Sequence, residues 1–323
     1  MSKGFMMFAH NNDEIDYLKL AIVNAMLIKE NCDIHDITVV TNQASYDYNV
    51  ETLGKEFIHD AVSNFIITEK DSAFKTANQR MYKDTNHTSK PLSFYNKDRG
   101  DAYELSPYDE TILIDADYLI LSDALNNCWG HNNDVMMNWS YEDIMYERED
   151  PTLRRLHPVG ITMYWATVVY FKKGNFAEQF FSTVQHVRDN RDYYQSIYKW
   201  PGRLYRNDYS FSIAAHMLGG FKDKAIPQLP LPTLYKTFDR DDVHSAPAKN
   251  EIIFYLEKPK SLGDFMICKW KGVDIHVMNK WAINRISNQL MEYVAWRNSN
   301  SNKLLKIKKT LWIKQKKSKS KKN

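Results

Sequence analysis

The chain has 323 residues, of which 43% are hydrophobic, 26% are charged and 13% are aromatic. This composition is typical of a globular protein and excludes a disordered chain. No stretch reaches the roughly 18 consecutive apolar residues of a membrane-spanning helix, and the short apolar start of the chain predicts a strand rather than a signal peptide. The net charge of +3 is unevenly distributed: ten lysines and no acidic residue lie between Lys303 and Lys322, so the remainder carries −7.

The three cysteines, Cys32, Cys128 and Cys268, are scattered along the chain. No pair has the spacing of metal ligands, and the odd number does not indicate a disulfide framework. Free thiols are typical of a reducing compartment, so we expect a cytoplasmic protein.

The order of the apolar patterns predicts an α/β fold with a mostly parallel sheet. Strands are predicted at 4–9, 36–42, 64–68, 111–114, 134–138, 161–172, 265–268 and 273–278. Helices are predicted, from apolar residues at helical spacing, at 15–29, 175–188, 208–218 and 280–296. Residues 70–110 are polar, and residues 226–263, which five prolines interrupt, are expected to be irregular. The β-α-β-β order of the first elements favours a parallel sheet flanked by helices.

The most informative motif is the stretch 111–120, TILIDADYLI. Asp115 and Asp117 follow a short apolar strand directly, and ligands of an α/β sheet bind at the carboxyl ends of its strands. Two carboxylates one residue apart offer the hard oxygen ligands with which Mg²⁺ or Mn²⁺ bridges a protein and a diphosphate. Most Asp-x-Asp triplets are surface turns, but the apolar runs on both sides favour the metal–diphosphate role here.

Residues 105–117, LSPYDETILIDAD, resemble the lead-in L-S-P-Y-D … L-D-A-D of GT-A nucleotide-sugar glycosyltransferases of the glycogenin and galactinol-synthase type. Similar features follow in order: a strand at 167–171, an Asn-Asp helix start at 207–208 and a late strand ending at His276. The resemblance covers residues 4–295. It implies a Rossmann-like GT-A fold with a single catalytic domain over residues 1–298. The implied enzyme moves a sugar from a nucleotide-sugar donor, UDP-linked by preference, to a glycan, lipid-linked or protein acceptor.

The resemblance also implies a metal site. In the family, the Asp-x-Asp motif, here Asp115, Ala116 and Asp117, binds the nucleotide and Mn²⁺ or Mg²⁺, with His276 as the third metal ligand. Lys280 would contact the phosphates, although this chain lacks the glycine of the family pattern H-x-x-G-x-x-K and has a shorter gap. A mixed oxygen and nitrogen ligand set suits Mn²⁺ better than Ca²⁺. Taken alone, His276 is as readily explained as a structural histidine on a strand.

Further nucleotide contacts are implied at the end of the first strand and ahead of the Asp-x-Asp strand. The nucleobase and ribose would be held by Phe8, Ala9, His10 and Asn11. Arg99 is favoured as an additional contact to the diphosphate, against the general expectation that a single basic residue is surface charge. The alternative for the loop is a helix cap, with Asn12 or Asp13 capping the helix from residue 15.

The acceptor side is less sharply marked. Asp208 is the candidate catalytic residue, contacting sugar hydroxyls or acting near the anomeric carbon, and its alternative is a helix cap, which Asn207 would serve equally well. Trp165 and Thr167 are acceptor-side candidates, because an aromatic ring can stack on a sugar, although a strand tryptophan is more often a core residue. An inverting enzyme needs a carboxylate base, whereas the glycogenin-like pattern implies retention through leaving-group stabilisation and positioning.

Residues 299–323 form a Lys-rich tail. Apolar residues at 304, 307 and 311 have helical spacing between lysines, and Trp312 suits an interface, so the tail is predicted to contact an anionic membrane surface. The protein would then lie peripherally on the cytoplasmic face of a membrane. A disordered solubilising tail, or a non-specific nucleic-acid contact, is the alternative, and no specific nucleic-acid partner is indicated.

Two other classes compete with the transferase. A nucleotidyltransferase acting on sugar phosphates also uses metal-binding carboxylates on an α/β sheet, but residues 8–11 lack the glycine-rich phosphate loop that such enzymes carry near the first strand. A non-catalytic carbohydrate-binding protein on a degenerate transferase fold is disfavoured because Asp115 and Asp117 are both present.

Overall fold

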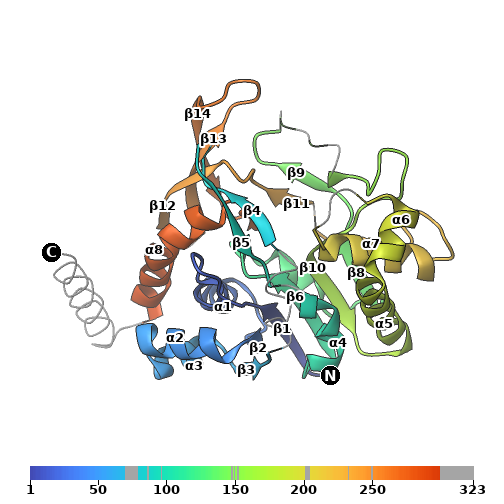
Figure 1. Cartoon of the computed structure of the whole chain (residues 1–323). Coiled ribbons are helices and arrows are strands. Elements are labelled where there is room, and N and C mark those ends of the chain that lie inside the picture. The colour runs from blue at the N-terminus through green and yellow to red at the C-terminus, as the bar shows by residue number, and fades with distance from the viewer. Residues whose placement is uncertain are drawn as a thin grey trace.

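The computed structural model describes most of the chain. The described residues are 1–69, 79–85, 87–95, 97–146, 148, 150, 153–200, 204–231, 233–248 and 250–298, with side chains up to residue 292. Figure 1 shows a central sheet between helices, with an antiparallel arm that rises from one side.

The central sheet has six strands in the order β3-β2-β1-β6-β10-β8. They are β1 (Lys3–Phe8), β2 (Ile37–Thr41), β3 (Asn64–Ile67), β6 (Glu110–Asp115), β8 (Val135–Asn138) and β10 (Trp165–Lys172). The first four strands in this order are parallel, and β10 runs antiparallel to both of its neighbours. Phe8 is paired with Asp115, so the carboxyl ends of β1 and β6 meet at one edge of the sheet.

Helices cover both faces of this sheet (Figure 1). They are α1 (Tyr17–Asn31), α2 (Gln43–Leu53), α3 (Lys55–Ala61), α4 (Ala102–Leu105), α5 (Asn175–Asp189), α6 (Arg191–Tyr198), α7 (Asn207–Leu218) and α8 (Lys280–Asn298), with 3₁₀ turns η2 (Lys97–Asp101) and η3 (Ala124–Cys128). Successive strand side chains point to opposite faces, so Phe5 and Met7 join the core cluster that contains α1 and α8, whereas Met6 joins the cluster that contains α5 and α7. A strand buried on both faces carries no polar side chain there, as β1 shows at residues 4–7.

Three smaller sheets complete the fold. One has the order β7-β15-β11-β9 and another the order β12-β13-β14, and β4 pairs with β5 in a hairpin. Their strands are β4 (Gln79–Lys83), β5 (Ser89–Ser93), β7 (Tyr118–Leu119), β9 (Tyr141–Asp143), β11 (Leu234–Lys236), β12 (Asp242–Ala248), β13 (Glu251–Glu257), β14 (Phe265–Lys271) and β15 (Ile275–His276). His276 pairs with Tyr118, which brings a residue from late in the chain beside the turn that follows β6.

The predicted α/β class, with a mostly parallel central sheet flanked by helices, is confirmed. Its first helix begins at Tyr17, not at residue 15, and the expected cap at Asn12 or Asp13 is wrong, because the Asp16 side chain accepts from the backbone N–H of Lys19. The predicted strand at 161–172 begins only at Trp165. Two helices, α2 and α3, lie between β2 and β3, where the sequence analysis predicts no helix or strand.

The expectation that residues 226–263 are irregular is wrong. Strands β11, β12 and β13 lie in this stretch. Pro247 lies within β12, which is an edge strand of its sheet, and a missing N–H is tolerated at an edge. The polar residues before β6 likewise contain the β4–β5 hairpin.

No helix in the described part of the chain is long and apolar enough to cross a membrane. The Lys-rich tail at 299–323 lies outside the described residues, so its predicted contact with a membrane surface stays a prediction.

Candidate active site

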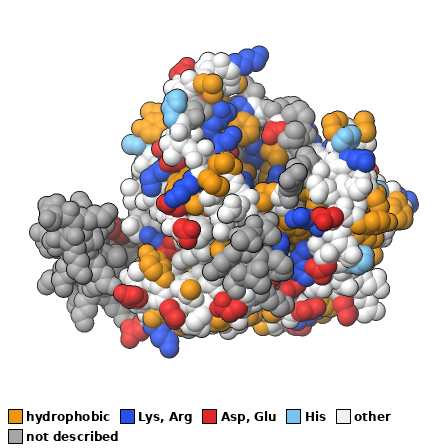
Figure 2. All heavy atoms as spheres, in the orientation of Figure 1, with side chains coloured by type: hydrophobic (Ala, Val, Ile, Leu, Met, Phe, Trp, Pro, Cys, Tyr) orange, Lys and Arg blue, Asp and Glu red, His pale blue; other side chains and the backbone are white. Residues whose placement is uncertain are grey.

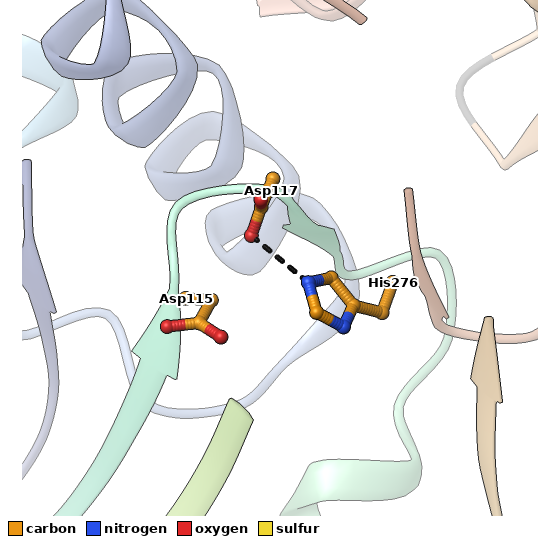
Figure 3. A group of neighbouring side chains, drawn as sticks. All are labelled: Asp115, Asp117 and His276. Carbon is orange, nitrogen blue, oxygen red and sulfur yellow. Dashed lines mark ion pairs between the residues drawn. The ribbon is translucent and has the colours of Figure 1, made fainter. Parts of the chain in front are cut away.

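Two carboxylates and an imidazole converge where β6 ends. Asp115 is the last residue of β6, Asp117 lies in the turn to β7, and His276 projects from β15 (Figure 3). One ligand atom from each residue lies within 4.8 Å of the others. His276 Nε2 is 3.3 Å from Asp117 Oδ1. Three side chains that are far apart in the sequence thus form one compact cluster.

His276 is fixed from its other ring nitrogen. Thr167 Oγ1 lies 3.3 Å from His276 Nδ1, and the Trp165 ring meets the imidazole edge-on with centroids 6.3 Å apart. A histidine held at Nδ1 presents Nε2 in a fixed direction, as metal-ligating histidines do. Thr167 and Trp165, predicted on the acceptor side, therefore also contact the proposed metal ligand.

Each aspartate of the cluster has a cationic partner. Arg99 Nη1 lies 2.9 Å from Asp115 Oδ1, and the Lys280 ammonium group pairs with Asp117 Oδ2. Arg99 is buried, and its guanidinium also donates to the carbonyl oxygens of Ile114, Ala166 and Thr167. These carbonyls leave Arg99 little freedom, so its position relative to Asp115 is set by the end of the sheet.

The two carboxylates differ in their electrostatic surroundings. Burial raises the pKa of Asp115 above its ordinary value, against the opposing effect of Arg99. Burial acts on Asp117 in the same sense, but Lys280 and His276 outweigh it and hold the pKa of Asp117 well below its ordinary value. Asp117 is consequently ionised at all physiological pH values.

The cluster lines a pocket of about 170 Å³. Eight further predicted site residues lie in its wall, beside the cluster of Asp115, Asp117 and His276: Phe8, His10, Arg99, Ala116, Trp165, Thr167, Asp208 and Lys280. The structure thus brings most of the predicted site residues together. Ala9 and Asn11 are not among the wall residues: Ala9 O accepts from Thr41 Oγ1, and Asn11 Oδ1 accepts from the backbone N–H of Leu18.

His10 is a buried residue of this wall with both ring nitrogens unpartnered. Its side chain is 3% exposed, and neither ring nitrogen has a hydrogen-bond partner in the structure. Burial lowers the pKa of His10 from 6.5 to about 4, so the ring is neutral at pH 7. A neutral imidazole carries one hydrogen-bond donor and one acceptor. His10 therefore suits a ligand that offers both an acceptor and a donor.

Asp208 is held on both carboxylate oxygens. Oδ1 accepts from the backbone N–H of Ala166 at 2.9 Å, and Oδ2 accepts from Arg206 at 2.6 and 3.1 Å. The helix-cap alternative is wrong for both candidates, because α7 begins at Asn207 with no side-chain cap bond. Asp208 instead ties the start of α7 to β10 at the pocket.

Sequence reasoning missed Arg80, Arg206 and Tyr17, which also line the pocket. Arg80 lies in β4, with its guanidinium 5.6 Å from the ring centroids of Tyr82 and Phe94. Its signal is weak, because β4 is a short strand within a polar stretch. The sequence signal for Arg206 is stronger, because Arg206 directly precedes Asn207 and Asp208, the helix start named in the sequence analysis.

The donor set fits a divalent cation. Two carboxylate oxygens and one imidazole nitrogen gather at the end of a buried strand, and this mixture suits Mn²⁺ better than Ca²⁺ or a thiolate-preferring ion. Lys280 pairs with Asp117 Oδ2 while His276 lies at Oδ1. The carboxylate can therefore keep Lys280 on one oxygen and offer the other to a cation.

No family model matches this chain, and no curated protein matches it in sequence. Among solved structures, it is similar to the galactosyltransferase LgtC in complex with donor and acceptor sugar analogs, at 12% identity and a TM-score of 0.38, over 72% of this chain and 73% of that one. It is also similar to mouse xyloside xylosyltransferase 1, at 12% identity and a TM-score of 0.39, over 68% and 83% of the two chains. A third is the inositol-1-phosphate CTP transferase from T. maritima, at 8% identity and a TM-score of 0.31, over 55% and 72%. Similarities this loose do not assign a function to the chain, so the assignment depends on the site residues.

Proposed function

We propose that this chain is a metal-dependent glycosyltransferase of the GT-A type. It moves a sugar from a nucleotide-sugar donor, a UDP-sugar by preference, to a glycan, lipid-linked or protein acceptor. The observation that carries the proposal is the Asp115, Asp117 and His276 cluster at the carboxyl edge of a mostly parallel sheet. At such an edge, ligands of open α/β sheets bind.

The pocket has the charges that a nucleoside diphosphate requires. The guanidinium and ammonium groups of Arg80, Arg99, Arg206 and Lys280 face three carboxylates in its described wall, those of Asp115, Asp117 and Asp208. The described wall thus has one more cationic side chain than acidic ones, before any metal ion is added. When bound, Mn²⁺ or Mg²⁺ would supply Lewis-acid stabilisation of the diphosphate leaving group.

We assign the phosphates to Lys280 and Arg80 and the nucleobase side to His10. Lys280 lies at the metal-ligand cluster, and Arg80 faces the same pocket from the β4–β5 hairpin. His10 follows β1 and has unused ring nitrogens. Positively charged donors at fixed positions stabilise the charge that develops on the departing diphosphate.

The surroundings of Asp208 support a retaining reaction. A catalytic base for inversion must be a carboxylate that is free to accept a proton from the acceptor. Among the described wall residues, Asp208 is the carboxylate outside the metal-ligand cluster, and Arg206 and Ala166 already occupy both of its oxygens. Asp208 is therefore better suited to positioning the sugar than to abstracting a proton.

The proposal is tested by supplying the full-length protein and Mn²⁺ with a panel of nucleotide sugars and following the release of nucleoside diphosphate. Release from a UDP-sugar that stops on addition of a chelator supports the transferase. Pyrophosphate release from a nucleoside triphosphate and a sugar phosphate would instead identify a nucleotidyltransferase. Sugar binding without release from any donor would identify a carbohydrate-binding protein.

A further inference from the structure

The tip of the β13–β14 hairpin, residues 258–267, is an exposed apolar projection. Leu262 is 76% exposed, Ile267 68%, Met266 42% and Phe265 40%. Residues 260–267 are exposed without interruption. Figure 1 shows this hairpin rising at the end of the arm, away from the central sheet. Four large apolar side chains on one projecting turn are unusual for a surface that faces only water.

The same hairpin is basic. Its tip and second strand, residues 258–271, contain four lysines and one acidic residue, Asp264, and β13 adds Glu251 and Glu257, so the hairpin has a surplus of one lysine although the chain outside the Lys-rich tail is acidic as a whole. Lys258 pairs with Asp264 at 3.0 Å and Lys269 with Glu251 at 2.8 Å, and Lys260 and Lys271 are both exposed. In Figure 2 basic and hydrophobic side chains lie next to one another at the top of the molecule, where Figure 1 places the hairpin.

Apolar side chains are exposed on both faces of the hairpin. Neighbouring residues of a strand point to opposite sides, so Phe265 and Ile267 leave one face of β14 and Met266 leaves the other. A flat protein partner would bury one face and leave the second in water. A fluid lipid interface surrounds the projecting element and takes up both faces, while lysines further along the strand reach anionic headgroups.

We propose that the β13–β14 hairpin inserts its tip into the surface of an anionic membrane. Leu262, Phe265, Met266 and Ile267 enter the interface, and Lys260 and Lys271 contact the headgroups. Each lysine near such a surface adds electrostatic attraction that salt weakens. This inference does not depend on the proposed sugar transfer, because no residue of the pocket takes part in it.

A second copy of the chain is a less suitable occupant. β14 is an edge strand, and an edge strand can pair with the same strand of another molecule. However, Lys269 and Lys271 lie on β14, and edge lysines commonly prevent this pairing. The charge of the hairpin thus opposes self-association and favours an anionic surface.

The test measures partition of the full chain onto phosphatidylcholine vesicles with and without phosphatidylglycerol. The double variant Leu262→Ser/Ile267→Ser removes two exposed apolar side chains, and Lys260→Glu/Lys271→Glu reverses two charges. Val159→Ser is the matched control, because Val159 is 88% exposed and lies outside the hairpin. Every variant keeps the Lys-rich tail, so a difference between them reports on the hairpin alone. Thermal melting checks that the variants remain folded.

We expect the wild-type chain to bind vesicles that contain phosphatidylglycerol, and each double variant to bind them about tenfold more weakly. Val159→Ser should bind like the wild type. Equal partition of the wild type and the hairpin variants would overturn the proposal, as would a wild type that binds no vesicles. So would a wild-type dimer, seen by light scattering, that Leu262→Ser/Ile267→Ser converts to monomers, because the tip would then be an interface between copies.

Discussion

The Lys280 ammonium group pairs with the Asp117 carboxylate inside the pocket, although one residue begins α8 and the other follows β6. Lys280 also donates to the carbonyl oxygen of Val277 at 2.9 Å. This contact fixes the lysine beside the strand that carries His276. The Asp117 carboxylate thereby contacts both His276 and Lys280.

Thr167→Val should weaken Mn²⁺ binding by about 10- to 100-fold, because it removes the hydroxyl that holds His276 Nδ1 while preserving the shape of the side chain. Calorimetric titration with Mn²⁺ measures the effect. Thr167→Ser restores the hydroxyl and should recover most of the affinity. If valine and serine bind Mn²⁺ equally well, Thr167 does not orient the histidine.

Arg80→Ala should weaken the binding of UDP by about tenfold to a hundredfold, because a charge-assisted hydrogen bond to phosphate is lost. Uridine, which lacks phosphate, should bind both forms alike. Lys83→Ala is the control, since Lys83 lies on the same strand but is exposed and outside the pocket wall. An equal loss of affinity for uridine would show that Arg80 acts on the fold of the hairpin instead.

Asp115 and Asp117 could be proposed as metal ligands from the sequence because they end a strongly apolar run, whereas His276 was implied only by the family resemblance. The structure places the three side chains together. Arg80 could not be predicted in this way, because β4 has the sequence Gln-Arg-Met-Tyr-Lys, in which the two faces are not separated by polarity. Its place in the pocket depends on tertiary packing between distant segments, which no local pattern records.

The parallel core of the fold was predictable, and its peripheral sheets were not. β1 and β6 are buried on both faces, and their central residues, 4–7 and 112–114, carry no polar side chain. β12 has the sequence Asp-Val-His-Ser-Ala-Pro-Ala, and its pairing with β13 shifts register twice. A strand that contains proline and polar residues resembles a loop until its partner strand is known.

The free energy of unfolding should fall as the pH drops from 6.5 to 4, partly through His10. Burial lowers the pKa of His10 from 6.5 to about 4, so the unfolded chain binds a proton in this range that the folded chain excludes. The contribution is complete above pH 6.5 and amounts to about 3 kcal/mol, lost progressively towards pH 4.

Urea unfolding of His10→Gln across this range measures the contribution of His10. The variant should lose less stability than the wild type as the pH falls, and His131→Gln, at an exposed position, should follow the wild type. Identical pH profiles for the wild type and His10→Gln would contradict the assigned pKa.

Arg148→Met should lower the free energy of unfolding by about 3–5 kcal/mol, because it leaves two buried carboxylates without their shared cation. The Arg148 guanidinium donates to Asp143 at 2.7 Å and 2.9 Å and to Asp241 at 2.6 Å and 2.7 Å. Arg191→Met removes the exposed pair with Asp192 and should cost less than about 1 kcal/mol. Urea denaturation compares the two, and equal losses would mean that the Arg148 network adds no stability.

The central claim is that Asp115, Asp117 and His276 hold the cation through which a nucleoside diphosphate binds. Calorimetric titration of UDP, with and without Mn²⁺, into the wild type and Asp117→Asn tests it most directly, with Asp192→Asn on the exposed surface of α6 as the control. We predict UDP binding that requires Mn²⁺, disappears in Asp117→Asn and persists in Asp192→Asn. UDP binding that is unchanged in Asp117→Asn, or the absence of any Mn²⁺-dependent nucleotide binding by the wild type, would contradict the account.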